Sequence, residues 1–175
     1  MNWDAIGAIG EVFGAAGVIA SLLYLSIQIR KSDQTARAES LSSLLDGWRD
    51  RSGLHLFLDA DVPEIFAKGL TDFELLEPSG KRRFFYMITE SVFQAQQAMQ
   101  LHQRGLLPDV DYDAWIYYVA SLIQTPGGRQ VWPLIESTIT PTIRGVINDY
   151  MAANPDTASY LDLNPLLRYS EESAV

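Results

Sequence analysis

The longest apolar stretch of the chain lies at its start, from Ala5 to Ile29, and ends abruptly at Arg30 and Lys31. It contains a single charged residue, Glu11. A helix of this length, at ~1.5 Å per residue, reaches ~37 Å, which is enough to cross a ~30 Å hydrocarbon core with some tilt. The pattern therefore predicts a transmembrane helix within residues 1–31.

Two other interpretations of this stretch stay open. A cleaved signal peptide has basic residues before its apolar core, whereas here Asp4 precedes the core and the basic residues follow it. A glycine-rich helix in the core of a soluble domain is the second alternative. We expect the membrane span in preference to both.

Charges near the stretch predict its orientation. Arg30, Lys31 and Arg37 follow it closely, and no lysine or arginine precedes it. Because basic residues concentrate on the cytoplasmic side, we expect the bulk of the chain in the cytoplasm. The absence of cysteine from the sequence fits a reducing compartment.

Small residues recur along the stretch at alternating spacings of three and four. They are Gly7, Gly10, Gly14, Gly17 and Ser21. Such a glycine seam leaves one helix face without bulky side chains, so that another helix backbone can approach closely in the membrane. With one predicted span per chain, the partner belongs to another molecule, either a second copy of this chain or a different membrane protein. We expect a homo-oligomer.

Glu11 flanks the glycine seam and has two interpretations. An ionisable side chain inside a membrane is costly and is by default a functional candidate, here an ion or proton site. If the span begins at Val12, Glu11 instead lies among the lipid headgroups near the helix N-terminus, where the helix dipole favours a carboxylate.

The same segment carries a resemblance to a known kind of protein. The residues that carry the resemblance are Trp3-Asp4, Ile6-Gly7, Ile9-Gly10-Glu11, the later glycines, Leu23-Tyr24-Leu25 and Ile27-Gln28-Ile29-Arg30. With them, the segment resembles the N-terminus of uncharacterised small bacterial single-span membrane proteins that have a cytoplasmic helical domain. The resemblance is clearest over about the first 30 residues. It implies a bacterial inner membrane and no particular chemistry.

The rest of the chain shows helical periodicity and no sustained alternation of period two. Short connections favour antiparallel neighbours. We therefore predict an all-α fold, in which the transmembrane helix precedes a four- to five-helix cytoplasmic bundle at 32–153 and an acidic tail at 154–175. We expect the first helix to continue through Leu41–Trp48, with a possible extension over Leu54, Phe57 and Leu58. A short helix is expected near Pro63, capped by Asp61. The later helices are expected at Ser79–Arg104 and Asp111–Gln124, and two more are expected to begin at Pro126 and Pro141.

The net charge of the chain indicates which classes of partner it can bind. The formal charge of −9 at pH 7 repels phosphate backbones, so we expect no nucleic-acid partner. One basic cluster, Lys81-Arg82-Arg83, stands at a helix start. It is either a contact for anionic lipid headgroups or a solvated charge cluster.

We find no constellation of residues typical of an enzyme or a metal centre. The sequence has two histidines, His55 and His102, and no cysteine, so the usual zinc ligands are missing. Asp109, Asp111 and Asp113 resemble a calcium loop but lack its glycine and distal glutamate. Gly127-Gly128 lacks the strand and lysine of a phosphate loop. We expect no cofactor and no metal.

Trp48, Trp115 and Trp132 either line a pocket or belong to the core. Together these features predict a non-enzymatic, membrane-anchored structural or accessory subunit. The alternatives are a homo-oligomeric ion or proton channel with a ring of Glu11 side chains and, third, a membrane-tethered enzyme.

Overall fold

The computed structural model describes residues 3–48 and 61–169; the side chains of residues 3–10, 12, 13 and 48 lie outside this description. In these ranges every element is helical and none is a strand, which confirms the all-α prediction. The elements are α1 (Trp3–Trp48), α3 (Val62–Thr71), the 3-10 helix η2 (Phe73–Leu75), α4 (Pro78–Gln103), α5 (Asp109–Ile123), α6 (Pro126–Glu136), α7 (Pro141–Ala153), α8 (Tyr160–Leu163) and the 3-10 helix η3 (Pro165–Leu167).

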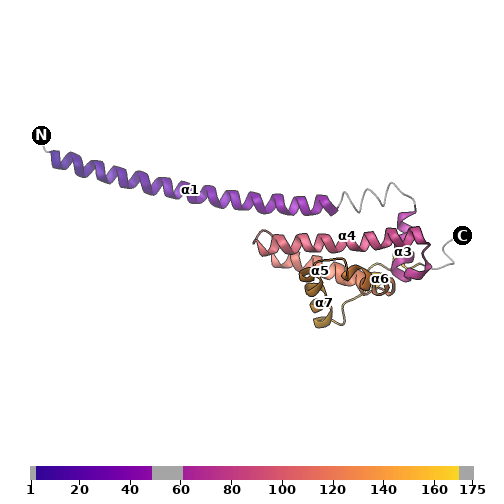
Figure 1. Cartoon of the computed structure of the whole chain (residues 1–175). Helices are drawn as coiled ribbons and strands as arrows, with labels where there is room; N and C mark the ends of the chain where they lie inside the picture. The colour runs from indigo at the N-terminus through magenta and orange to yellow at the C-terminus, as the bar shows by residue number, and fades with distance from the viewer. Residues whose placement is uncertain (1–2, 49–60, 170–175) are drawn as a thin grey trace. The chain divides into compact units, whose positions relative to one another are not determined.

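The chain consists of two compact units, Met1–Ser40 and Leu41–Val175. The division falls inside α1, whereas the sequence placed the start of the bundle at residue 32. Helix α1 is drawn in indigo to purple in Figure 1, and the helices of the second unit follow in magenta to orange.

Helix α1 continues without interruption to Trp48, as predicted for Leu41–Trp48. The predicted extension over Leu54, Phe57 and Leu58 lies outside the described residues, as do the side chains of residues 5–10, 12 and 13 of the predicted span. Within the described part, no helix combines the length and the apolar character needed to cross a membrane. The transmembrane span thus stays a prediction.

The second unit is a helical bundle built around α4. This helix packs against α3, α5, α6 and α7, and Figure 1 shows α5 running beside it. Its apolar stripe supplies Phe84, Ile88 and Val92 to the main core, and all three side chains are fully buried. α5, α6 and α7 contribute Val119, Val131 and Ile147 on the facing sides.

Two glycines allow α3 and α6 to approach closely. Gly69 and Gly127 are both buried. A Cβ built on Gly127 would overlap the Gly69 carbonyl oxygen and lie 2.8 Å from its carbonyl carbon. A Cβ on Gly69 would in turn lie 2.6 Å from Cγ of Phe84. Gly127 therefore serves close packing at the start of α6.

A smaller core cluster joins the end of α1 to the bundle within the second unit. Leu44 is fully buried there against Ala98 and Leu107. The connection between α4 and α5 turns at Gly105, whose φ of +69° lies in the left-handed region that favours glycine. Gly105 therefore lies just past the C-cap of α4, where the chain leaves the helix.

The predicted acidic tail begins with an ordered segment that packs on the bundle. Leu161 of α8 is buried in the main core, and Ser159 and Asp162 form a capping box at the start of α8. The backbone N–H of Tyr169 donates to Oγ1 of Thr71 at 3.3 Å. Residues 160–169 therefore belong to the compact unit, while Glu171 and Glu172 lie outside the described residues.

Candidate functional site

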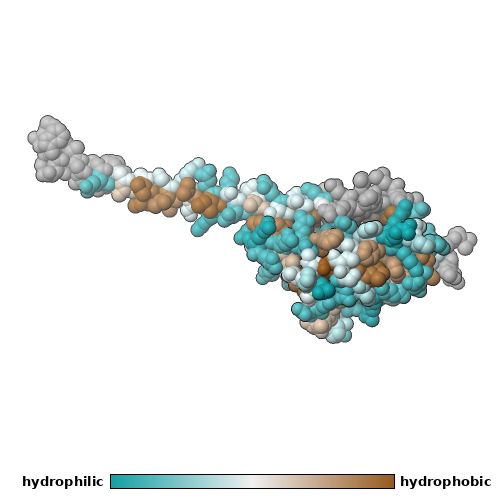
Figure 2. All heavy atoms as spheres, in the orientation of Figure 1, coloured by the Kyte–Doolittle hydropathy of each residue, from teal (hydrophilic) through white to brown (hydrophobic). Residues whose placement is uncertain are grey.

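The most unusual surface of the described chain is the apolar part of α1. Its large apolar side chains are 54–67% exposed, and Figure 2 shows them as a brown band along the helix. They are Val18, Ile19, Leu22, Leu23, Tyr24, Leu25, Ile27 and Ile29. Because successive residues of a helix are ~100° apart, these side chains point to several sides of α1 and do not form a single stripe. A helix that is apolar on most sides is normally enclosed by protein or lipid.

The described part of the glycine seam is open. A Cβ built on Gly14 or on Gly17 would meet no atom within 4 Å. The hydroxyl of Ser21 donates to the Gly17 carbonyl at 2.8 Å, so this hydroxyl is satisfied within its own helix. Gly7 and Gly10 lie in α1, and their surroundings are outside the description. The side chain of Glu11 is exposed.

Two groups of basic residues were singled out from the sequence: Arg30, Lys31 and Arg37, and the cluster Lys81-Arg82-Arg83. Arg30, Lys31 and Arg37 are exposed on α1, and no ion pair with a described carboxylate is formed by any of them. In the bundle, Lys81 pairs with Glu74 and lies over the ring of Phe73 at 5.3 Å. The Lys81-Arg82-Arg83 cluster is therefore partly engaged in local contacts: Arg83 also takes part in an interaction, whereas Arg82 is exposed.

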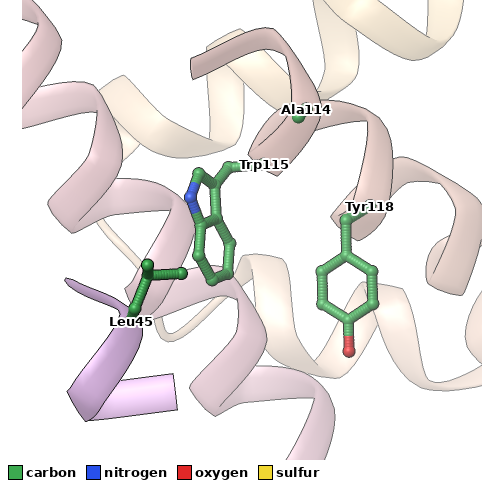
Figure 3. Close-up of a pocket in the computed structure, with 4 residues that line it drawn as sticks. All are labelled: Leu45, Ala114, Trp115 and Tyr118. Atoms are coloured by element: carbon green, nitrogen blue, oxygen red, sulfur yellow. The ribbon is translucent and has the colours of Figure 1, made fainter. Parts of the chain in front are cut away.

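An apolar pocket of about 250 Å³ lies in the second unit. It is lined by Leu45, Ala114, Trp115 and Tyr118, and Figure 3 shows the Trp115 indole between Leu45 and the Tyr118 ring. The rings of Trp115 and Tyr118 meet edge to face, with centroids 6.3 Å apart. Trp115 thus lines a pocket, as one of the two interpretations predicted, and it also packs against the smaller core cluster.

Trp132 follows the other interpretation and belongs to the main core. Its indole N–H donates to Oδ1 of Asn148 at 3.2 Å, which satisfies the buried donor. The side chain of Trp48 lies outside the described residues.

A second, more polar hollow of about 550 Å³ lies where α6 begins and α8 begins. Arg129 and Asp162 are its charged lining residues. Arg129 donates to the Gln124 amide oxygen at 2.6 Å. The hydrogen bond from the Ser159 hydroxyl is the main cause that lowers the pKa of Asp162, and the backbone N–H of Ser159 and the guanidinium of Arg168 add to it. The side chains of Arg129 and Asp162 therefore both form hydrogen bonds with neighbouring residues.

His102 makes contacts at the end of α4. Its Nδ1 lies 3.2 Å from the Leu107 carbonyl oxygen and 3.7 Å from Oδ1 of Asp109, and its ring stacks on Tyr112 with centroids 4.5 Å apart. His102 therefore links the end of α4 to the connection that follows and to the start of α5. His55 lies outside the described residues.

No metal centre is formed by the residues that the structure describes: nowhere in those ranges do three or more histidine, aspartate or glutamate side chains come together. Asp109 and Asp111 lie in the first turn of α5, where the helix dipole favours carboxylates. Gly127 and Gly128 follow Thr125, whose hydroxyl caps the helix by accepting from the Gly128 N–H at 3.0 Å.

Leu45 and Ala114 are pocket residues that the sequence did not single out. Ala114, Trp115 and Tyr118 share one face of α5 by their spacing, and this signal was available from the sequence. Leu45 comes from a distant helix, so its place beside Trp115 depends on tertiary packing.

A comparison of the chain with protein-family models, with curated proteins and with solved structures finds no match.

Proposed function

We propose that this protein is a membrane-anchored structural or accessory subunit, in which the apolar part of α1 lies in a lipid bilayer and the helical bundle faces water. The observation that carries the proposal is the exposure of large apolar side chains on several sides of α1, with Leu23 and Ile27 62% and 66% exposed. Burying one such side chain is worth ~1.5–3 kcal/mol.

The free energy gained by burying these side chains favours an environment that removes α1 from water. Eight exposed apolar side chains represent on the order of 10 kcal/mol of unrealised burial. This equals the whole stability of a typical domain, ~5–15 kcal/mol. A bilayer supplies the missing apolar surroundings, since its hydrocarbon core accepts a helix whose backbone hydrogen bonds are all internal.

The charges beside the apolar segment favour one orientation. Arg30, Lys31 and Arg37 stand on its C-terminal side and are unpaired with described carboxylates. The tendency of basic residues to stay in the cytoplasm then places the bundle there, as expected for the inner membrane of a bacterium.

The proposed role is non-catalytic, with assembly through the glycine seam into a homo-oligomer. The open surface at Gly14 and Gly17 supports close approach of another helix. The aromatic pocket at Trp115 offers little chemistry, because Tyr118 supplies the only titratable side chain among the lining residues that the structure describes.

Replacement of Gly14 by leucine is expected to dissociate the oligomer. The added side chain separates the two backbones by several ångströms and removes the close packing that drives association in lipid. Native mass spectrometry of the detergent-solubilised full chain measures the copy number. We expect a multiple of the chain mass for the native protein and the monomer for Gly14→Leu.

Ala16→Leu is the matched control, since Ala16 is exposed and lies ~200° around the helix from Gly14. This variant is expected to keep the native copy number. An oligomer that survives Gly14→Leu unchanged would remove the glycine seam from the account and leave the membrane anchor in place.

A further inference from the structure

Some basic residues of the bundle pair with carboxylates, whereas the three on α1 have no such partner among the described residues. In the bundle, Lys68 pairs with Glu64, Lys81 with Glu74 and Arg168 with Asp162, while the exposed Arg82 and Arg104 form no ion pair with a described carboxylate. On α1, Arg30 and Arg37 form no ion pair with any residue that the structure describes, although Asp33 lies three residues after the first and four residues before the second. Three cations with no described carboxylate partner therefore gather within one short stretch of an otherwise acidic chain.

Helix geometry directs these cations toward the apolar segment. Arg30 and Lys31 follow Ile29 directly, and Arg37 lies on the same face as Arg30, ~10 Å further along the axis. Cα–Cβ bonds in a helix tilt toward its N-terminus, so all three side chains lean back toward the apolar segment. Long basic side chains can extend further in that direction to reach an interface.

We propose that Arg30, Lys31 and Arg37 bind the headgroups of anionic phospholipids at the membrane surface where α1 leaves the bilayer. This inference rests on the proposed membrane anchor and adds the lipid class to it. Charge complementarity carries it: the three side chains are exposed and lie directly beyond apolar side chains that fit hydrocarbon. Each basic residue near an anionic surface favours binding by an amount equivalent to about a five-fold change in affinity.

The test is a lipid-selectivity measurement on the full chain reconstituted in vesicles of phosphatidylcholine and phosphatidylglycerol. Spin-labelled forms of the two lipids report by electron paramagnetic resonance the fraction held at the protein surface. Because each of the three cations holds its own headgroup in this proposal, we expect the anionic label to associate about five-fold more strongly than the neutral label with the native chain. In the variant Arg30→Gln/Lys31→Gln/Arg37→Gln the ratio is expected to fall to about one, by the same reasoning.

The control variant is Arg82→Gln/Arg104→Gln, which removes two exposed cations of the bundle. It is expected to keep the native selectivity. Soluble glycerol phosphate, added in excess, is expected not to displace the held lipid, because the binding surface includes the bilayer.

Four results would overturn the inference. Equal association of both labels with the native chain would remove the preference for anionic lipid while leaving the membrane anchor intact. Loss of selectivity in the Arg82→Gln/Arg104→Gln variant, or displacement by glycerol phosphate, would assign the binding to other residues or to a free phosphate. Absence of any protein-held lipid would contradict the membrane anchor as well.

Discussion

Gly127→Ala is expected to destabilise the bundle by about 3 kcal/mol or more, which is a large part of the stability of a domain. The added methyl group would overlap the Gly69 carbonyl oxygen and lie 3.2 Å from the backbone nitrogen of Phe73. These are backbone atoms of α3 and η2 that face the start of α6, so no side-chain rotation can relieve the overlap. Near-UV circular dichroism during urea or thermal unfolding, in detergent, measures the loss.

Gly145→Ala is the matched control for this prediction. Gly145 lies inside α7, and a Cβ built on it would meet no atom within 4 Å. Because alanine favours a helix by ~1 kcal/mol over glycine, this variant is expected to be slightly more stable than the native chain. Equal stability of the two variants would show that α3 and α6 do not pack as closely as described.

Ile19→Arg with Leu23→Arg is expected to release the chain from membranes. The two residues are one helical turn apart on α1, on the side opposite Gly14, and both are about 60% exposed. An arginine near the centre of a span costs ~2.5–3.5 kcal/mol, so the pair opposes insertion by about 6 kcal/mol. Carbonate extraction of cell membranes, followed by immunoblotting, measures the fraction that stays with lipid.

The control places the same two charges outside the apolar segment, as Gln34→Arg with Ser43→Arg. Both positions are exposed on α1, and this variant is expected to remain in the membrane fraction. If the Ile19→Arg/Leu23→Arg chain resists carbonate as well as the native chain, the apolar segment is not the anchor.

Helix boundaries were predictable from the sequence where a local signal specifies them. Thr125 followed by Pro126 gives a capped helix start, and Pro141 opens α7. Asp61 stands at the expected N-cap of α3, but its side chain makes no capping hydrogen bond. The reason is its backbone: at φ −82° and ψ −17° Asp61 is already helical, whereas a capping residue has extended dihedrals.

The start of α5 differs from the prediction for a local reason. α5 begins at Asp109, two residues before the expected Asp111, because Pro108 at φ −61° and ψ 155° takes the N-cap position. The ordered start of the C-terminal segment was also missed. Ser159 and Asp162 have the spacing of a capping box, and this signal was present in the sequence.

The packing between distant segments was not predictable from the sequence. The approach of Gly127 to Gly69 and the position of Leu45 beside Trp115 join helices that lie far apart along the chain. Apolar periodicity identifies which face of each helix is buried but not which helix covers it. For the apolar part of α1, the sequence predicted the segment, and the structure shows the large apolar side chains from Val18 to Ile29 exposed, while the surroundings of the segment remain a proposal.

Cysteine labelling tests the position of α1 most directly. The chain contains no cysteine, so Leu23→Cys and Ser43→Cys each introduce a single thiol at an exposed position of α1. A water-soluble maleimide needs water and the thiolate form, and hydrocarbon provides neither. In intact vesicles that contain the full chain, we predict rapid labelling at position 43 and none at position 23 until detergent dissolves the bilayer. Labelling of both positions at equal rates before detergent is added would contradict the membrane anchor.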